Sequence, residues 1–230
     1  VNLYLLHARL VDFNHDTQTW APALAEQWKL EPDRKTVSVR LREGLQFSDG
    51  HPLTAEDVTF TLQALYDKRT ASPLLRDTLL MEGKAIEATA TDARTLRLSF
   101  PEQVAAPESY LTNLPVLPRH ILAAAFEQGT MSTAWTLNES PEHIVTAGPF
   151  VPEALQPNLS LKLKRNPHYW KKDQKGTPLP YLNGITLEAI SDANNTLLRL
   201  TQGTLDLADR IRASDFATLQ SAAGAVRAYD

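Results

Sequence analysis

Residues 47–65 read FSDGHPLTAEDVTFTLQAL. Four side chains that often serve in metal centres or acid–base pairs gather within it, namely Asp49, His51, Glu56 and Asp57. The stretch therefore allows two interpretations. It is either a reactive site or the structural start of a helix.

The local pattern favours a helix start. Thr54 and Asp57 have the spacing of a capping box, and Leu53 and Val58 occupy the positions of a hydrophobic staple around it. Carboxylates in a first helical turn are favoured by the helix dipole by about 0.3–1 kcal/mol each. We therefore predict a helix that begins at Ala55. Its buried side follows helical spacing and consists of Ala55, Val58, Leu62 and Leu65.

The residues upstream of this helix indicate a tight turn. Asp49 suits an Asx-type turn, and Gly50 suits a positive φ. A metal or acid–base site is the weaker interpretation, because the cluster lacks the i,i+4 ligand pair of a zinc helix. Glu56 and Asp57 also point about 100° apart around a helix. We predict no catalytic and no metal-ligating residue here.

Several other segments alternate apolar and polar residues with a period of two, which is typical of half-buried strands. These segments are 37–41, 96–100, 159–163 and 185–187. Helices are predicted over residues 55–66, over Arg119–Gln128, and between an N-cap at Ser191 and Gly203. The predicted fold class is mixed α/β.

The composition limits the possible functions. A net charge of −4 with scattered Lys and Arg argues against a nucleic-acid-binding face. The chain has no cysteine, so disulfides and cysteine-ligated zinc are excluded. No apolar run approaches the roughly 20 residues of a transmembrane helix. The sequence also lacks the known hydrolase patterns, in which a nucleophile is activated by an oriented base.

Two irregular stretches interrupt the pattern. A domain boundary is predicted near LPVLPRH, residues 114–120, because two prolines separate two halves that each hold strands. The stretch 165–184 is long, polar and aromatic, and we expect Tyr169, Trp170 and Tyr181 to anchor it to the rest of the protein.

Nine blocks in one order resemble a known family. They are LAEQW at 24–28, LREG at 41–44, FSDGHPLTAEDV at 47–58, TASP at 70–73, LPRHIL at 117–122, TAGPF at 146–150, LKRNPHYW at 163–170, LPYLNGI at 179–185 and GTLDLA at 203–208. They look like the family 5 extracellular solute-binding proteins, which are peptide, oligopeptide and nickel receptors of bacterial ABC transporters. The resemblance covers nearly the whole chain.

The resemblance implies a fold and a domain organisation. Members have the periplasmic-binding-protein type II fold, in which two α/β lobes close over a ligand, and they carry an extra small domain. By resemblance, residues 1–118 match the small domain and residues 119–230 match part of the first ligand-facing lobe. Members are longer than 230 residues, so we expect this chain to be the N-terminal portion, without the opposing lobe.

The resemblance also implies site residues. In the family, the residues just after the G-x-x-D-[IL] strand approach the ligand, and here these are Asp209, Arg210, Ile211 and Arg212. The segment that matches TASP leads to another residue that lines the cleft, here Leu74. The alternative interpretation is an exposed strand end for the first four residues and plain packing for Leu74.

The implied function is solute binding without catalysis or a cofactor, outside the cytoplasm, with delivery to an ABC transporter permease. Contact with the membrane would come through the permease or through a lipid anchor outside these residues. The ligand stays open among peptides, nickel chelates, sugars and opine-like compounds. A ligand-sensing or chaperone-like interaction module on the same fold is the alternative. In either role, residues 1–230 alone are expected to bind solute poorly.

Overall fold

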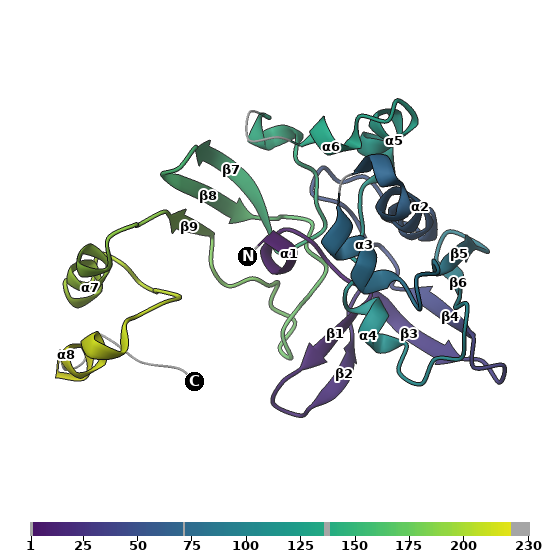
Figure 1. The fold of residues 1–230 in the computed structure, drawn as a ribbon, viewed down its shortest axis with the longest axis horizontal. Coiled ribbons are helices and arrows are strands. Elements are labelled where there is room, and N and C mark those ends of the chain that lie inside the picture. The colour runs from purple at the N-terminus through teal and green to yellow at the C-terminus, as the bar shows by residue number, and fades with distance from the viewer. Residues whose placement is uncertain (1, 71, 136–138, 222–230) are drawn as a thin grey trace. The chain divides into compact units, whose positions relative to one another are not determined.

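The computed structural model describes residues 2–70, 72–135 and 139–221. Groups of strands and groups of helices follow one another along the chain, which confirms the predicted mixed α/β class (Figure 1). The strands are β1 (Val11–Asn14), β2 (Thr19–Pro22), β3 (Ala25–Leu30), β4 (Thr36–Leu41), β5 (Glu87–Ala90), β6 (Thr95–Ser99), β7 (Phe150–Gln156), β8 (Ser160–Arg165) and β9 (Gly184–Glu188). The α-helices are α1 (Asn2–Leu5), α2 (Ala55–Tyr66), α3 (Pro73–Leu79), α4 (Glu108–Leu111), α5 (Arg119–Glu127), α6 (Met131–Ala134), α7 (Ala193–Thr201) and α8 (Phe216–Ser221).

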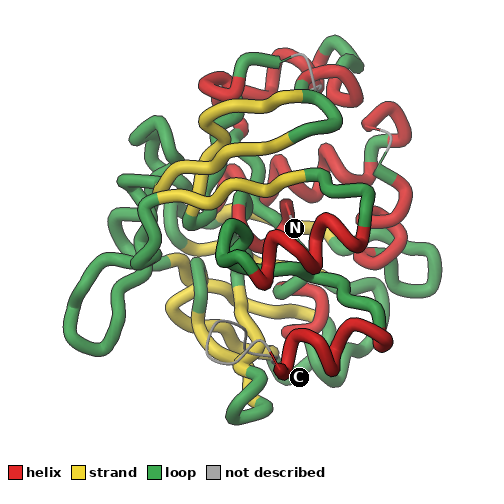
Figure 2. The backbone as a smooth tube through the Cα atoms, turned by 90° about the vertical axis from the view of Figure 1, so that its left-hand side faces the viewer, coloured by secondary structure: helices red, strands yellow, loops and turns green. Residues whose placement is uncertain are grey.

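In the described part of the chain the strands form three sheets, which can be followed along the backbone in Figure 2. The largest has the order β3-β4-β6-β5, and β4 pairs with β6 so that Val37 lies opposite Leu98 and Val39 opposite Leu96. These four side chains are buried, as the period-two pattern predicts. β1 and β2 form a hairpin, and β7, β8 and β9 form the third sheet.

α2 packs against β5 and supplies one wall of the main hydrophobic core. The four apolar residues predicted for its buried side are all buried, which confirms the predicted stripe: Ala55, Val58, Leu62 and Leu65. Phe47, at the start of the quoted stretch, is fully buried in the same core. Each fully buried side chain of this size contributes roughly 1.5–3 kcal/mol to stability.

The start of α7 differs from the prediction. Asp192 is the N-cap rather than Ser191, and its Oδ1 accepts a hydrogen bond from the amide of Asn195 at 2.7 Å. Ser and Asp both cap helices well. The prediction was wrong by one residue because the sequence has two adjacent residues that can cap a helix, Ser191 and Asp192. Asp192 stands three positions before Asn195, so its side chain reaches the free amide of that residue.

The irregular stretch after β8 is anchored by part of the expected aromatic set. Trp170 packs against the main core, and the guanidinium of Arg42 lies 4.5 Å from the centre of its ring. The side chain of Tyr181, in contrast, is 66% exposed, and its hydroxyl donates to Asp173 within the same loop. The prediction that Tyr181 anchors the loop was wrong.

The chain divides into two compact units, and each is described by itself. The first comprises residues 1–155 and 162–185, and the second comprises residues 156–161 and 186–230. The first unit runs across residue 118 without a division. The assignment of residues 1–118 to a small domain and of residues 119–230 to a ligand-facing lobe stays a prediction.

A close backbone crossing lies inside the first unit. The amide of Gly148 donates to the carbonyl of Leu6 at 2.9 Å, and a Cβ on Gly148 would lie 2.4–2.7 Å from backbone atoms of Leu6 and His7. Asn166 is buried, and its Nδ2 donates to the carbonyl of Gly148 at 2.8 Å. Gly148 of the TAGPF block therefore holds the N-terminal segment in place, and Asn166 of the LKRNPHYW block supports Gly148.

The stability of this crossing is expected to depend on pH. Burial lowers the pKa of His7 from 6.5 to about 4, and its Nδ1 has no hydrogen-bond partner among the described residues. The unfolded chain takes up the proton from about pH 6.5 downward, whereas the folded chain resists protonation until about pH 4. Stability therefore falls as the pH drops through this window, by about 3 kcal/mol in all.

Urea unfolding measured at pH 7 and again near pH 4.5 tests this expectation. His7→Gln should flatten the decrease in unfolding free energy, whereas His15→Gln, a change at an exposed histidine between β1 and β2, should leave it in place. Equal pH dependence in the two variants would show that His7 is not the group responsible.

Candidate functional site

The acidic stretch joins the starts of two helices. The side chain of Asp57 is buried, and its Oδ2 accepts from the amide of Thr54 at 2.8 Å and from its hydroxyl at 3.1 Å. Its Oδ1 accepts from the amide of Arg119, at the first position of α5, at 3.0 Å. Glu56 is exposed and pairs with the guanidinium of Arg119 at 2.9 Å. One carboxylate thus satisfies free amides of both α2 and α5.

The turn before α2 is held by Asp49. Its Oδ1 accepts from the amide of His51 at 3.0 Å, as predicted for an Asx turn, and Gly50 has φ +85°. Its Oδ2 pairs with Nε2 of His120 at 2.7 Å. Burial raises the pKa of Asp49, but the hydrogen bonds from His120 and the His51 amide lower the pKa more, so the net shift is downward.

Two further contacts tie the same turn to later parts of the chain. Ser48 exchanges two hydrogen bonds with Thr146, at 2.8 and 3.1 Å. The Oε1 atom of Gln46 pairs with Nδ1 of His168 at 3.0 Å. The turn therefore joins three segments that the sequence places about 70 to 120 residues away.

A cavity of about 760 Å³ lies beside this turn, lined in part by His51, Asp92 and His120. The two imidazoles do not converge on a shared point, because their rings are stacked 3.8 Å apart at 17°. In residues 2–70, 72–135 and 139–221, no three His, Asp or Glu side chains are arranged to hold a metal ion. The geometry supports the structural interpretation of the stretch.

Four of the five candidate solute-contacting residues, Asp209–Arg212, lie in the second unit. Arg210, Ile211 and Arg212 line a pocket of about 210 Å³ together with α7. Asp209 is exposed and lies outside the lining. The structure thus brings three consecutive candidates to one pocket, while their role in solute binding stays a prediction.

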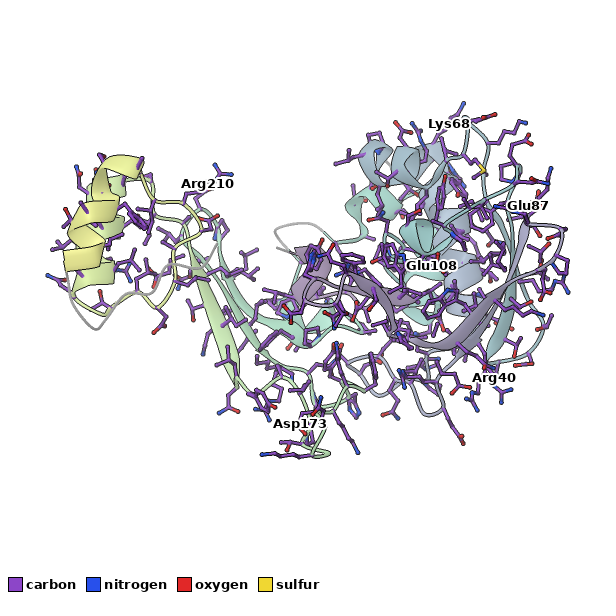
Figure 3. The ribbon with its side chains drawn as sticks, turned by 90° about the horizontal axis from the view of Figure 1, so that it is seen from below. Arg40, Lys68, Glu87, Glu108, Asp173 and Arg210 are labelled. Atoms are coloured by element: carbon purple, nitrogen blue, oxygen red, sulfur yellow. The ribbon has the colours of Figure 1, made fainter. Side chains whose placement is uncertain are left out.

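The two arginines of this pocket differ in what they bind. Arg212 pairs with Asp215 at 2.7 Å and donates to Oδ1 of Asn194 at 2.7 Å, so its position is fixed. Arg210 has no ion pair within the described part of the chain, and Figure 3 shows its side chain extending away from the ribbon. Arg210 is therefore the guanidinium that is available to an anionic group.

The wall of the pocket contains residues that the sequence reasoning missed. Four side chains of α7 face the arginines: Ala193, Thr196, Leu197 and Leu200. Their spacing is i, i+3, i+4 and i+7, which marks one face of a helix. This spacing, applied to the helix predicted before Gly203, could have identified them.

Leu74 lies on α3 in the first unit, where its side chain is 81% exposed. Such exposure argues against plain packing as its role. No contact in the described structure assigns it a ligand, so its role in lining a cleft also stays a prediction.

The chain matches a protein-family model over most of its length. The model described as bacterial extracellular solute-binding proteins, family 5 Middle, matches residues 19–229. The chain belongs to this family. The predicted resemblance is confirmed, and family 5 is a family of extracellular solute-binding proteins rather than of enzymes.

Individual relatives agree with the family 5 assignment. A probable ABC transporter-binding protein of Deinococcus radiodurans is 30% identical over 204 residues, which cover 86% of this chain and 34% of the relative. A periplasmic alpha-galactoside-binding protein of Rhizobium meliloti is 32% identical over 186 residues, which cover 77% of this chain and 27% of the relative.

A solved structure supports the fold. The ABC transporter substrate-binding protein CtaP of Listeria monocytogenes aligns with a TM-score of 0.75 and 26% identity, over 94% of this chain and 41% of that chain. The periplasmic-binding-protein type II fold is therefore confirmed.

The chain spans about a third of the length of the two curated relatives from Deinococcus radiodurans and Rhizobium meliloti.

A helix that crosses a membrane must be both long and apolar. Within residues 2–70, 72–135 and 139–221, none of the helices meets both conditions.

Proposed function

We propose that this family 5 chain is part of the solute-binding component of an ABC importer. In this proposal the protein captures a peptide or a similar small solute between two lobes and delivers it to a membrane permease. The observation that carries the proposal is the family match over residues 19–229, supported by the likeness to the CtaP structure over 94% of the chain.

The segment Asp209–Arg212 is proposed to contact the solute. The free guanidinium of Arg210 can donate charge-assisted hydrogen bonds to a carboxylate or to peptide carbonyls. Ile211 and the apolar residues of α7 can cover an uncharged part of the solute beside it. Binding needs no bond to be made or broken, so we propose neither catalysis nor a cofactor.

The chemical class of the solute is proposed broadly. One relative carries alpha-galactoside in its name, so membership in the family alone does not select peptides. Capture outside the cytoplasm, with a permease as the partner and with attachment to the membrane through that permease or a lipid anchor, completes the proposal.

We expect residues 1–230 to hold solute weakly, because a two-lobed receptor gains affinity from contacts on both sides of its cleft. The chain aligns with only 27–34% of the lengths of the two curated relatives. Calorimetric titration with short peptides and with an α-galactoside trisaccharide should give a Kd weaker than about 0.1 mM for each.

Weak binding can still be located by nuclear magnetic resonance at millimolar solute. The solute that binds should shift the amide signals of residues 209–212, and Arg210→Ala should remove these shifts while Lys68→Ala, a change at an exposed lysine of the first unit, should not. Micromolar affinity for the intact chain would contradict the expected weakness. Shifts confined to residues 49–57 would contradict the proposed site.

A further inference from the structure

The segment 162–175 has a charge opposite to that of the chain. It holds six of the 23 Lys and Arg residues and one of the 27 acidic residues, in a protein of net charge −4. The six are Lys162, Lys164, Arg165, Lys171, Lys172 and Lys175, and the acid is Asp173. The second half of this segment leads into an exposed loop.

The residues Lys171–Leu182 form a closed loop, called the basic hairpin below. Lys172 and Pro178 form an isolated antiparallel bridge, and the amide of Leu179 donates to the carbonyl of Lys171 at 2.9 Å. Figure 3 shows Asp173 on this loop, which projects from the neighbouring ribbon of the same unit. The loop therefore has a defined shape and an exposed tip.

The single acid of the segment is used inside the hairpin. Asp173 accepts from the amides of Lys175 and Thr177, both at 2.8 Å, and from the hydroxyl of Tyr181 at 2.8 Å. Its pKa is lowered by these hydrogen bonds, with the Tyr181 hydroxyl as the largest cause. Asp173 thus shapes the loop.

The outer side chains of the hairpin are cationic and apolar. Lys172 and Lys175 are exposed, and neither has an ion pair in the part of the chain that the structure describes. The guanidinium of Arg165 donates to the backbone carbonyls of Tyr181 and Leu182, which places a third cation beside them. The side chains of Tyr181 and Leu182 are 66% and 60% exposed.

We propose that the basic hairpin binds the anionic headgroups of a lipid bilayer. Lysine and arginine are attracted to an anionic membrane surface, and tyrosine and leucine suit the boundary between headgroups and acyl chains. A purely acidic protein face would match only the cations, whereas a bilayer also takes up Tyr181 and Leu182 at its headgroup boundary. The hairpin would give a chain of net negative charge one cationic surface that binds the membrane.

Co-sedimentation of the 230-residue chain with lipid vesicles tests the proposal. The chain should bind vesicles that contain about 30% phosphatidylglycerol at about 20 mM salt at least about fivefold more than vesicles of phosphatidylcholine alone. Binding should fall steeply at about 300 mM salt, where exposed charges are screened. Equal binding to both vesicles, or no binding at low salt, would overturn the proposal.

Charge-matched variants locate the binding surface. Lys172→Glu with Lys175→Glu should reduce binding about tenfold or more. Lys29→Glu with Lys68→Glu changes the net charge equally at exposed lysines of other elements, so it should reduce binding by less than about twofold. An equal loss in both pairs would mean that net charge rather than the hairpin controls binding, and would also overturn the proposal.

An apolar reporter separates insertion from simple charge attraction. The emission that Tyr181→Trp adds to that of the parent chain, which has four tryptophans of its own, should shift to shorter wavelength on anionic vesicles, because the ring enters the boundary region. No shift in this difference emission, despite sedimentation with the vesicles, would exclude the proposed contact of residue 181 with the bilayer. Thermal unfolding of each variant shows that the fold is intact.

Discussion

Gly148→Ala is expected to lower the free energy of unfolding by about 3 kcal/mol or more. The added Cβ would lie 2.4 Å from the carbonyl carbon of Leu6, 2.5 Å from its oxygen and 2.7 Å from the amide nitrogen of His7. All three are backbone atoms, so no side chain can rotate away, and the crossing must open. Urea unfolding of the variant and the parent chain measures the difference.

Gly176→Ala is the matched control. Gly176 has φ +82°, and a Cβ there would meet nothing within 4 Å. This substitution adds only the strain of a left-handed backbone, about 1–2 kcal/mol. A loss for Gly148→Ala no larger than the loss for Gly176→Ala would mean that the chain does not cross as closely as the structure shows.

Asp57→Ala is expected to cost about 3 kcal/mol, because three donors lose their acceptor at once. These donors are the amide and the hydroxyl of Thr54 and the amide of Arg119. The side chain is 5% exposed, so water cannot readily replace the carboxylate. Equilibrium denaturation at neutral pH measures the loss.

Glu56→Ala is the neighbouring control at an acid of the same helical turn. Glu56 is 64% exposed, and its pair with Arg119 is a surface salt bridge, which contributes roughly 0–1 kcal/mol. Asp57→Ala should therefore be clearly more destabilising than Glu56→Ala. Equal losses would show that Asp57 contributes only charge at the helix start and does not join two helices.

α2 could be predicted from the sequence because its signals are local. The capping box, the staple and the buried stripe all lie within twelve residues of one another, and the structure places the helix at Ala55–Tyr66. Period two likewise identified the inner strands of the largest sheet, since β4 and β6 bury one face each. The short helices α1, α3 and α4 lack such periodicity and were missed.

The contacts of the turn before α2 could not be predicted in this way. Asp49 pairs with His120, and Ser48 pairs with Thr146, across 71 and 98 residues. Each polar side chain by itself has several suitable partners in the sequence. Only the three-dimensional arrangement selects one.

The candidate solute-contacting segment could likewise be predicted only in part from the sequence. Residues 209–212 came from family resemblance, because a short charged stretch outside regular structure has no periodicity of its own. The α7 wall behind them has a clear helical spacing, yet a helix face alone does not reveal what it faces. The pocket appears only when the two segments fold back on each other.

The acidic stretch FSDGHPLTAEDV stabilises the fold through the hydrogen bonds of Asp57 at the starts of α2 and α5. Asp57→Asn tests this most directly, because it keeps the shape of the side chain and replaces one accepting oxygen by a donor. Strained functional groups often gain stability when they are replaced. We therefore expect the unfolding free energy of Asp57→Asn to be about 1–2 kcal/mol lower at neutral pH. An unchanged or increased unfolding free energy would contradict it.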